Sequence, residues 1–368
     1  MSNCTNYGKF TTKYYCKADG GTATSQGGVV GYSQMPVNNC SNEGVVNINT
    51  YCKNTYVGGV IGNVPFNVTG CSNNGSVALN LMGMTAASAN FRAGGVVGYC
   101  TKTISDCHNT GNVTTGCNAL NVTGTTIYSA SVVGDGYVIE NCSSSGSNVT
   151  NIETNSAYGT LYTAGVIGYA RTSVSGCTLS GSHTLNSDDA KASVRCAGIV
   201  AQIITRAGED AVISNCSTTE TATVTLSTSN SKANYTGGII ALCNNGVDGC
   251  TNNATISVKL NKQMTGTSIT YVGGVAGLQK VTINDCHNKG NIAVEMCNST
   301  APFYAGTVLG HNYSANAVAK NLSNSGTMTI TNAGNTDNIH AMVGVNDGVI
   351  NEETLTNTGK VVVNGTEL

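Results

Sequence analysis

A pentad of two small residues, two apolar residues and a closing small residue recurs ten times along the chain, and this repeat limits the possible folds more than any other feature. Successive copies lie 31 to 40 residues apart, a period typical of solenoids and related repeat arrays. The copies occupy residues 27–31, 58–62, 94–98, 130–134, 164–168, 197–201, 237–241, 273–277, 306–310 and 340–344.

A second element separates the pentads and is clearest in Ile104-Ser-Asp-Cys-His-Asn-Thr-Gly-Asn-Val113. One slot of this element holds Cys in nine copies and Leu in the last two. The residue before the slot is Asn, Asp or Gly in ten of eleven copies, and these residues tolerate a left-handed backbone, so we expect a bend there. Gly follows the slot by four residues in nine copies, often after Asn, which predicts a tight turn. The slot residues are Cys4, Cys40, Cys71, Cys107, Cys142, Cys177, Cys216, Cys250, Cys286, Leu322 and Leu355.

The two elements predict an all-β fold, a parallel β-helix or β-solenoid of about ten coils with roughly 35 residues per coil. Coils stacked at the strand spacing of about 4.8 Å would form a rod roughly 50 Å long. We therefore expect one solenoid domain over residues 1–368, with degenerate capping coils at about 311–368, where the slot Cys is lost. The chain opens within two residues of a motif, so we expect its N-terminal coil to continue into another domain or chain.

The two central pentad positions are apolar in every copy, as in Val96 and Val97. Because strand side chains alternate between faces, this predicts that both faces of the strand are covered and that a second layer or a partner approaches the small residues. Identical residues of successive coils should stack into ladders, and we expect the slot cysteines to form a buried column of reduced thiols. Cys16 and Cys52, each twelve residues after a slot Cys, would form a second short ladder.

The segment Gly94-Gly-Val-Val-Gly-Tyr-Cys-Thr-Lys-Thr-Ile-Ser-Asp-Cys-His-Asn-Thr-Gly-Asn-Val113 resembles the GLUG-type repeat of bacterial surface proteins and adhesins. The resemblance covers essentially the whole chain. It implies a large cell-surface or secreted repeat protein with an adhesive or structural role. The chain shows no signal peptide after Met1, which leaves its localisation open.

Composition and motifs argue against several functions. Charged residues make up 10% of the chain and the net charge is −2, which favours neither a nucleic-acid partner nor a membrane surface. The longest apolar runs are about five residues, too short for direct membrane insertion. His108 and His287 share a slot five coils apart, roughly 24 Å along the rod, so they cannot bind one metal ion. We expect no cofactor and no metal.

The sequence suggests one candidate binding site, a stripe of residues six positions before each closing pentad residue. Tyrosines interrupted by two arginines could stabilise the rod by stacking, or an exposed part of the stripe could stack sugar rings or bind a protein. We expect the stripe to be partly exposed. The candidate ligand-binding residues are Tyr56, Arg92, Tyr128, Tyr162, Arg195, Tyr235, Tyr271 and Tyr304.

The leading hypothesis is a non-enzymatic surface or extracellular repeat protein, acting as an adhesin-like binding module or a spacer rod, with glycans or host and cell-surface proteins as partners. One alternative is a polysaccharide-cleaving β-helix enzyme, which needs acidic side chains converging from adjacent coils. Another is a phage or viral receptor-binding fibre or a filament component. The adjacent acidic pairs are Asp188 and Asp189, Glu209 and Asp210, and Glu352 and Glu353.

Overall fold

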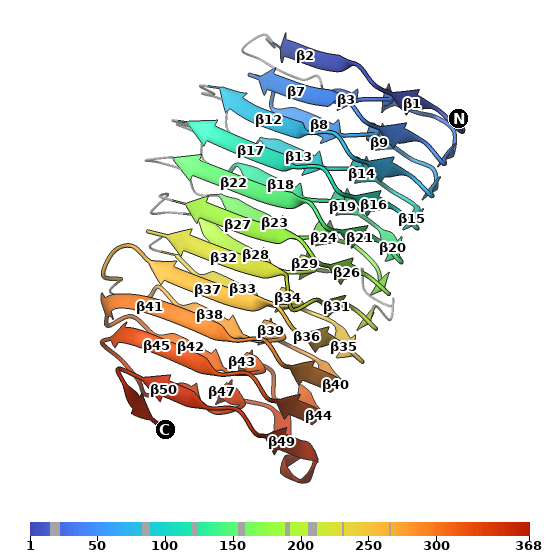
Figure 1. Ribbon diagram of the computed structural model, residues 1–368. Coiled ribbons are helices and arrows are strands. Elements are labelled where there is room, and N and C mark those ends of the chain that lie inside the picture. Colours follow the sequence, from blue (N-terminus) through green and yellow to red (C-terminus); the bar gives the residue numbers. More distant parts are fainter. Residues whose placement is uncertain are drawn as a thin grey trace.

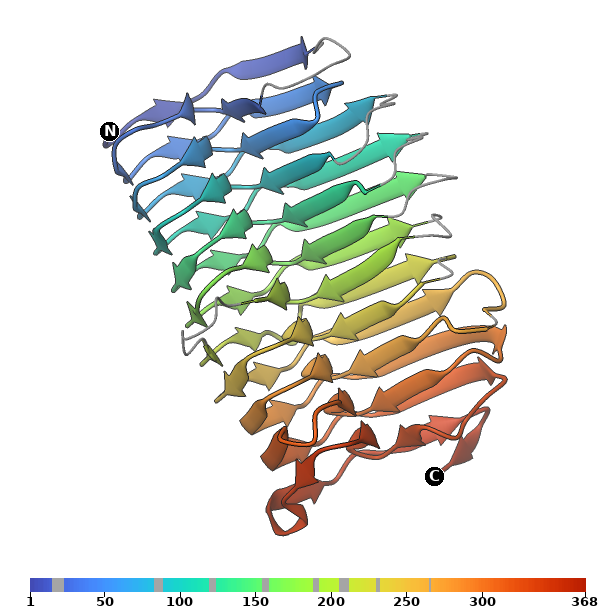
Figure 2. The ribbon, with the colours of Figure 1, turned by 180° about the vertical axis from the view of Figure 1, so that it is seen from behind.

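The chain forms a parallel β-solenoid, as the repeat predicts, with its two termini at opposite ends of the stack (Figure 1). The computed structural model describes residues 1–14, 23–82, 89–118, 124–153, 159–187, 192–204, 212–229, 232–264 and 266–368. Each coil passes in order through four parallel sheets, named here A to D. The same succession of coils is seen from behind in Figure 2.

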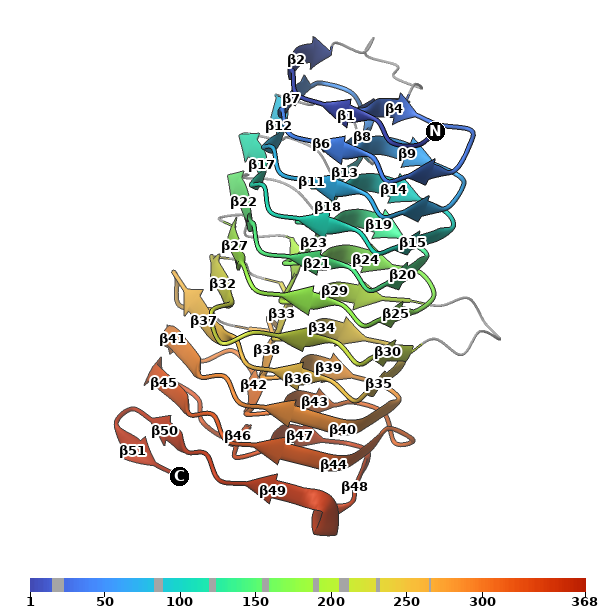
Figure 3. The same cartoon turned by 45° about the vertical axis from the view of Figure 1, so that its right-hand side comes forward.

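Sheet A contains the second sequence element and consists of two ladders of very short strands, which come forward in Figure 3. The ladders merge in the two strands that span both, β40 (Thr282–Asn288) and β44 (Val318–Asn324). The first ladder holds β5 (Val37–Asn38), β10 (Val68–Thr69), β15 (Thr103–Ser105), β20 (Val138–Glu140), β25 (Val174–Ser175), β30 (Val212–Ser214), β35 (Gly246–Asp248) and β48 (Val349–Ile350). The second holds β1 (Thr5–Asn6), β6 (Ser41–Asn42), β11 (Ser72–Asn73), β16 (His108–Asn109), β21 (Ser143–Ser144), β26 (Thr178–Leu179), β31 (Ser217–Thr218), β36 (Thr251–Asn252) and β49 (Leu355–Asn357).

Sheet B contains longer strands whose side chains alternate between the core and the outer surface, as in the buried and exposed residues of β37. Its last pair, β50 and β51, is antiparallel, so the chain turns back on itself at the C-terminal end of this sheet. The strands are β2 (Lys9–Tyr14), β7 (Val45–Thr50), β12 (Val77–Met82), β17 (Val113–Asn118), β22 (Ser147–Glu153), β27 (Ser182–Ser187), β32 (Thr223–Thr228), β37 (Thr255–Leu260), β41 (Ile292–Ser299), β45 (Met328–Ala333), β50 (Val361–Val363) and β51 (Thr366–Glu367).

Sheets C and D have ten strands each and are joined by the pentads. Sheet C contains β3 (Ala23–Gly27), β8 (Asn54–Gly58), β13 (Asn90–Gly94), β18 (Thr126–Ala130), β23 (Thr160–Ala164), β28 (Ser193–Ala197), β33 (Asn234–Gly237), β38 (Thr270–Gly273), β42 (Phe303–Gly306) and β46 (Ile339–His340). Sheet D contains β4 (Val30–Tyr32), β9 (Ile61–Val64), β14 (Val97–Cys100), β19 (Val133–Gly136), β24 (Ile167–Ala170), β29 (Val200–Ile203), β34 (Ile240–Cys243), β39 (Ala276–Gln279), β43 (Leu309–Asn312) and β47 (Val343–Asn346). A short 3-10 helix, η1 (Glu352–Thr354), precedes β49.

The pentad forms a corner between sheets C and D, and the prediction that it is a strand covered on both faces is wrong. Val96 ends the bend and Val97 begins β14, and both side chains are fully buried in the same core. The direction of the chain changes between them, so consecutive residues point inward without a second layer. A Cβ on Gly95 would overlap the carbonyl of Ser131 in the next coil and crowd the Asn109 side chain. The small residues therefore admit the neighbouring backbone and a core side chain of the same solenoid.

The bend before the slot residue is confirmed. The residue there has a positive φ in ten copies, at Asn3, Asn39, Gly70, Asp106, Asn141, Gly176, Asn215, Gly249, Asp285 and Asn321. This conformation turns the next side chain inward, and the slot cysteines from Cys40 to Cys286 are buried. The expected interior column is therefore confirmed, although Cys4 in the first coil is only partly buried.

The second short ladder of reduced cysteines is not supported. Cys52 is disulfide-bonded, and it follows the end of β7, outside the register that aligns the slot column. Cys16 lies outside the described residues.

An interior asparagine ladder runs beside the cysteine column. The Asn two residues after the slot donates from Nδ2 to the carbonyl two residues on and to Oδ1 of the corresponding Asn in the next coil. The link from Asn73 to Asn109 measures 2.6 Å, and that from Asn288 to Asn324 measures 2.8 Å. Ser144 and Leu179 interrupt the ladder, and Ser144 Oγ has no partner among the described residues. On either side of this break the interior amides are hydrogen-bonded, so their burial costs little and they help to fix the register of the coils. The sequence pattern indicated only a turn at this position.

Candidate functional site

The predicted stripe forms a single row on the outer side of sheet C. Each member pairs in register with the corresponding residue of the next coil, so the eight candidates follow one another along the rod. Their order is Tyr56, Arg92, Tyr128, Tyr162, Arg195, Tyr235, Tyr271 and Tyr304.

The row is a face-to-face stack over most of its length. The rings of Tyr128 and Tyr162 lie 4.9 Å apart at an interplanar angle of 8°, and those of Tyr235 and Tyr271 lie 4.8 Å apart at the same angle. The guanidinium of Arg195 fills the gap between the two pairs, 4.9 Å from the Tyr162 ring and 5.3 Å from the Tyr235 ring. Each such contact contributes roughly 0.5–1.5 kcal/mol. The stack therefore stabilises the coil-to-coil contacts of the solenoid.

Stacking also leaves the ring faces occupied, which corrects one expectation. Sugar rings cannot stack on faces that already contact the neighbouring coil, so the outward parts of the row are ring edges and phenol hydroxyls. Tyr128 and Tyr271 are buried, with 9% and 5% of their surface exposed. Tyr56, Tyr162 and Tyr304 are partly exposed, as are Tyr235 and Arg195. The expected partial exposure thus holds for four tyrosines and fails for the two whose neighbours cover them.

A second row, seven residues further along each coil, belongs to sheet D and contacts the first. The Tyr56 and Tyr99 rings stack at 5.5 Å, and Tyr162 meets Tyr169 edge-on at 5.1 Å. The outward side chains of the two sheets therefore converge, and we call the combined rows the aromatic seam. The second row contains Asn63, Tyr99, Asp135, Tyr169, Gln202, Leu242, Leu278 and His311.

Two arginines and one aspartate occupy the N-terminal half of the seam. Asp135 is fully buried, and its carboxylate accepts hydrogen bonds from Arg92 Nε at 2.7 Å and from Arg171 Nε and Nη2 at 2.8 and 2.6 Å. The Arg92 guanidinium lies between the Tyr56 and Tyr128 rings, at 5.1 and 4.8 Å. Two cations facing one carboxylate leave this half of the seam with a net positive charge.

The centre of the seam contains polar atoms without partners. Arg195 Nε and Nη1 are buried and make no hydrogen bond, and neither does the buried Oε1 of Gln202 in the same coil. No ion pair joins Arg195 to an acidic group among the described residues. Burying guanidinium N–H groups without a hydrogen-bond acceptor costs free energy. The centre of the seam is therefore the part best suited to bind an acceptor group of a ligand.

The C-terminal half of the seam is mostly apolar. Leu242, Tyr271 and Leu278 form a small cluster that is separate from the main core. His311 closes it, with its ring 5.2 Å from that of Tyr304 and its Nε2 2.9 Å from the Asp347 carboxylate. Burial lowers the pKa of His311, although hydrogen bonding to Asp347 opposes that shift.

Burial raises the pKa of several tyrosines of the seam. Burial raises the pKa of Tyr128, Tyr235 and Tyr271 above the ordinary value for a phenol. Burial, with the neighbouring Tyr162, raises the pKa of Tyr169 to about 12. At neutral pH these four side chains therefore carry uncharged hydroxyls, which can both donate and accept hydrogen bonds.

The other sequence candidates do not form a chemical site. His108 is exposed and bonds Ser143, and His287 makes the equivalent bond to Ser323. Glu352 and Glu353 are exposed in η1, whereas the acidic pairs at 188–189 and 209–210 lie outside the described residues. No group of three His, Cys, Asp or Glu side chains in the described part of the chain could hold a metal ion.

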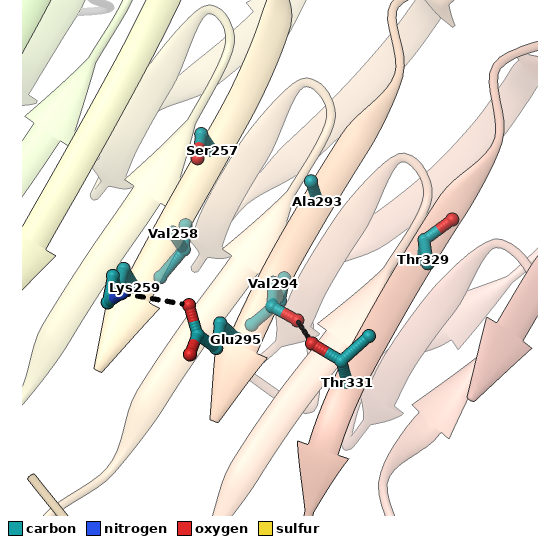
Figure 4. A pocket seen from close by; sticks show the side chains of 8 residues that line it. All are labelled: Ser257, Val258, Lys259, Ala293, Val294, Glu295, Thr329 and Thr331. Carbon is teal, nitrogen blue, oxygen red and sulfur yellow. Dashed lines mark hydrogen bonds and ion pairs between the residues drawn. The ribbon is translucent and has the colours of Figure 1, made fainter. Parts of the chain in front are cut away.

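Strands β37, β41 and β45 of sheet B line a pocket on the outer face of that sheet (Figure 4). Lys259 and Glu295 form an exposed ion pair of 3.1 Å beside it, and Thr331 bonds the carbonyl of Val294. Exposed pairs of this kind contribute at most about 1 kcal/mol. The pocket contains none of the residues that the repeat singled out.

Sequence reasoning missed the sheet D row, although a signal was present. A seven-residue offset from the stripe identifies Tyr99, Asp135 and Tyr169, but these chemically different residues do not form a visible pattern. Only the corner at the pentad brings the two rows together.

Comparisons of the chain with protein-family models, curated proteins and solved structures find no match. The fold itself defines the class, a parallel β-solenoid repeat protein with a lengthwise aromatic seam. Over the residues that the structure describes, no helix has the length and apolar character needed to cross a membrane.

Proposed function

We propose that this chain is a non-enzymatic repeat protein of the cell surface or the extracellular space, an adhesin-like module that binds glycans along the aromatic seam. The observation that carries the proposal is the row of six tyrosines in eight consecutive strands from β8 to β42. The resemblance of the repeat to GLUG-type repeats supports the surface location.

The phenol hydroxyls supply the binding groups. None of the six forms a hydrogen bond with another described residue, and none is among the buried atoms without a partner. In the stacked pairs, Tyr128 with Tyr162 and Tyr235 with Tyr271, the hydroxyls recur at about the coil spacing of 4.8 Å. A polymer with many hydroxyls can pair with such an array over several coils, so that weak individual contacts add up.

A binding role fits the seam better than hydrolysis. Glycoside cleavage uses two carboxyl groups on either side of the scissile bond. Asp135 lies in the sheet D row and bonds Arg92 in the sheet C row. Three hydrogen bonds from Arg92 and Arg171 occupy the oxygens of this carboxylate. A carboxylate held in this way is poorly placed to move a proton to or from a sugar.

The test removes hydroxyls without removing rings. Tyr162→Phe combined with Tyr235→Phe keeps the stack around Arg195 but deletes two hydroxyl groups. We expect the parent to bind glycans on an array, and the double variant to lose at least tenfold in affinity with a melting temperature within about two degrees of the parent. Tyr7→Phe is the matched control, because Tyr7 is 80% exposed and lies outside the seam. Absence of binding by the parent, or unchanged binding by the double variant, would contradict the proposal.

A further inference from the structure

We infer that the seam selects acidic glycans and that Arg195 binds their carboxylate. This inference rests on the proposed glycan-binding function and adds the chemical class of the ligand. Its starting point is the buried guanidinium edge of Arg195, whose Nε and Nη1 have no acceptor among the residues that the structure describes.

The N-terminal half of the seam shows what a guanidinium in this setting binds. Arg92 lies between two tyrosine rings at 5.1 and 4.8 Å, and its Nε donates to a carboxylate at 2.7 Å. Arg195 has the same kind of sandwich, at 4.9 and 5.3 Å. Arg92 is more buried and also contacts the Tyr99 ring, at 4.9 Å. The difference that bears on a ligand is that no carboxylate among the described residues pairs with Arg195.

The missing acid can be located in the sheet D row. Asp135, the acceptor for Arg92, lies in the coil after that arginine. The equivalent position for Arg195 holds Leu242, which cannot accept a hydrogen bond. Gln202, in the coil of Arg195, also has a buried Oε1 without a partner. A ligand that brings both a carboxylate and a hydroxyl would satisfy the arginine and the glutamine together.

Charge favours the same ligand. Among the described residues, Arg92 and Arg171 share the carboxylate of Asp135 and no acidic group pairs with Arg195. The described part of the seam is therefore cationic, in a chain whose net charge is −2. Tyrosine ring edges carry partial positive charge, and the phenol hydroxyls are neutral donors. An anionic polymer with many oxygen acceptors complements this surface, whereas an apolar or cationic one does not.

Spacing separates a glycan from an acidic peptide. Side chains on one face of an extended peptide repeat at about 6.7 Å, which does not match the coil spacing of about 4.8 Å. A sugar ring is about as long as one coil is high, so an extended polysaccharide along the rod presents roughly one ring to each tyrosine. We therefore commit to a carboxylated glycan.

The experiment compares polygalacturonate with the same polymer after carboxyl reduction, using biolayer interferometry on the whole chain. We expect the acidic form to bind at least tenfold more tightly. Arg195→Gln should abolish this preference, because the affinity for the acidic polymer should fall at least tenfold, to that for the reduced polymer. Lys259→Gln, which removes an exposed cation on sheet B, is the matched control and should behave as the parent.

The outcomes distinguish this inference from the proposed function. If neither polymer binds and no glycan on the array binds, the proposed function itself fails. If both polymers bind equally, or if Arg195→Gln keeps the preference, glycan binding stands and the role of Arg195 is refuted. Equal binding of polyglutamate would overturn the choice of a glycan.

Should Arg195→Gln fail to fold, the parent alone still provides a test. Arg195 as a whole residue is partly exposed, so salt should screen its attraction for a carboxylate. The preference for the acidic polymer should therefore shrink at least threefold between 50 mM and 500 mM NaCl. A preference that does not change with salt would refute the ionic contact.

Discussion

Replacing Asp135 with Asn would test how strongly the buried charges at the seam hold adjacent coils together. The variant keeps the size of the side chain but removes the charge that two guanidinium groups share. Removing one partner of a buried ion pair costs about 3–5 kcal/mol. The Arg171 side chain is 29% exposed and can turn its guanidinium toward water, so we expect the lower end of this range, about 3 kcal/mol.

Urea unfolding followed by circular dichroism measures this loss. A cost of about 3 kcal/mol should lower the urea midpoint by up to about 1 M, because m for a chain of this size is at least about 3 kcal/mol/M. Because neighbouring coils dominate the stability of a repeat array, amide exchange should also accelerate in β14, β19 and β24. Glu140→Gln is the control, since Glu140 is an exposed acid in the same coil and should change stability by less than about 0.5 kcal/mol.

A loss below about 1 kcal/mol for Asp135→Asn would refute the reasoning, because the guanidinium groups would then be adequately solvated without the carboxylate. A second comparison tests the cause. Adding Arg171→Gln to Asp135→Asn removes one of the two unpaired cations, so the combined cost should fall below the sum of the single costs. Strict additivity would show that the three side chains do not act together.

Three further predictions concern the core. Burial lowers the pKa of His183 to about 4 in the folded protein, against about 6.5 in the unfolded chain. Between these two pH values the unfolded chain binds a proton that the folded protein does not bind. The free energy of unfolding therefore decreases as the pH falls from about 6.5 to about 4. His183→Val should remove about 3 kcal/mol of the loss measured by urea unfolding between pH 7 and pH 4, and an unchanged acid response would contradict this. Gly95→Ala should lower the stability by about 1–3 kcal/mol or more, because its Cβ would overlap a carbonyl oxygen. Gly116→Ala is the control and should change the stability by less than about 0.5 kcal/mol, because the nearest atom to its Cβ is at 3.3 Å. Equal melting temperatures for the two variants would contradict the corner geometry. A maleimide should label Cys4 in the native protein but Cys107 only in urea, and equal native rates would place the cysteine column at the surface.

The fold could be predicted from the sequence because each structural feature recurs once per coil. A residue that must adopt a positive φ, such as Asp106, and the inward slot that follows it at Cys107 appear at the same place in successive copies. The in-register pairing of the stripe follows from the same period. Because the same residues recur once per coil, the sequence predicts which residues pair between neighbouring coils, which a single copy of the repeat would not show.

The pentad is predicted as a strand and forms a corner because the sequence does not show where the chain changes direction. Two adjacent buried residues, Val96 and Val97, fit both a strand covered on two faces and a sharp bend in the chain. The asparagine ladder was missed for a related reason. The Nδ2 of Asn109 donates to the carbonyl of Gly111 in the turn that the sequence predicts, and its Oδ1 also accepts from Asn73 in the preceding coil. Period alone cannot distinguish a side chain that caps a turn from one that faces the interior.

The geometry of the stack also changes how the tyrosines must be tested, because their structural and binding roles use different atoms. Tyr162 packs its ring faces against Tyr128 and Arg195, and these contacts contribute roughly 0.5–1.5 and 0.5–1 kcal/mol. Its hydroxyl contributes to neither contact. An alanine at this position removes both roles together, so a loss of binding would say nothing about ligand contact. A phenylalanine keeps the stack and removes the hydroxyl alone, and it should therefore lower affinity without lowering stability. If it destabilises the solenoid as much as alanine does, the hydroxyl is part of the structure and is not available to a ligand.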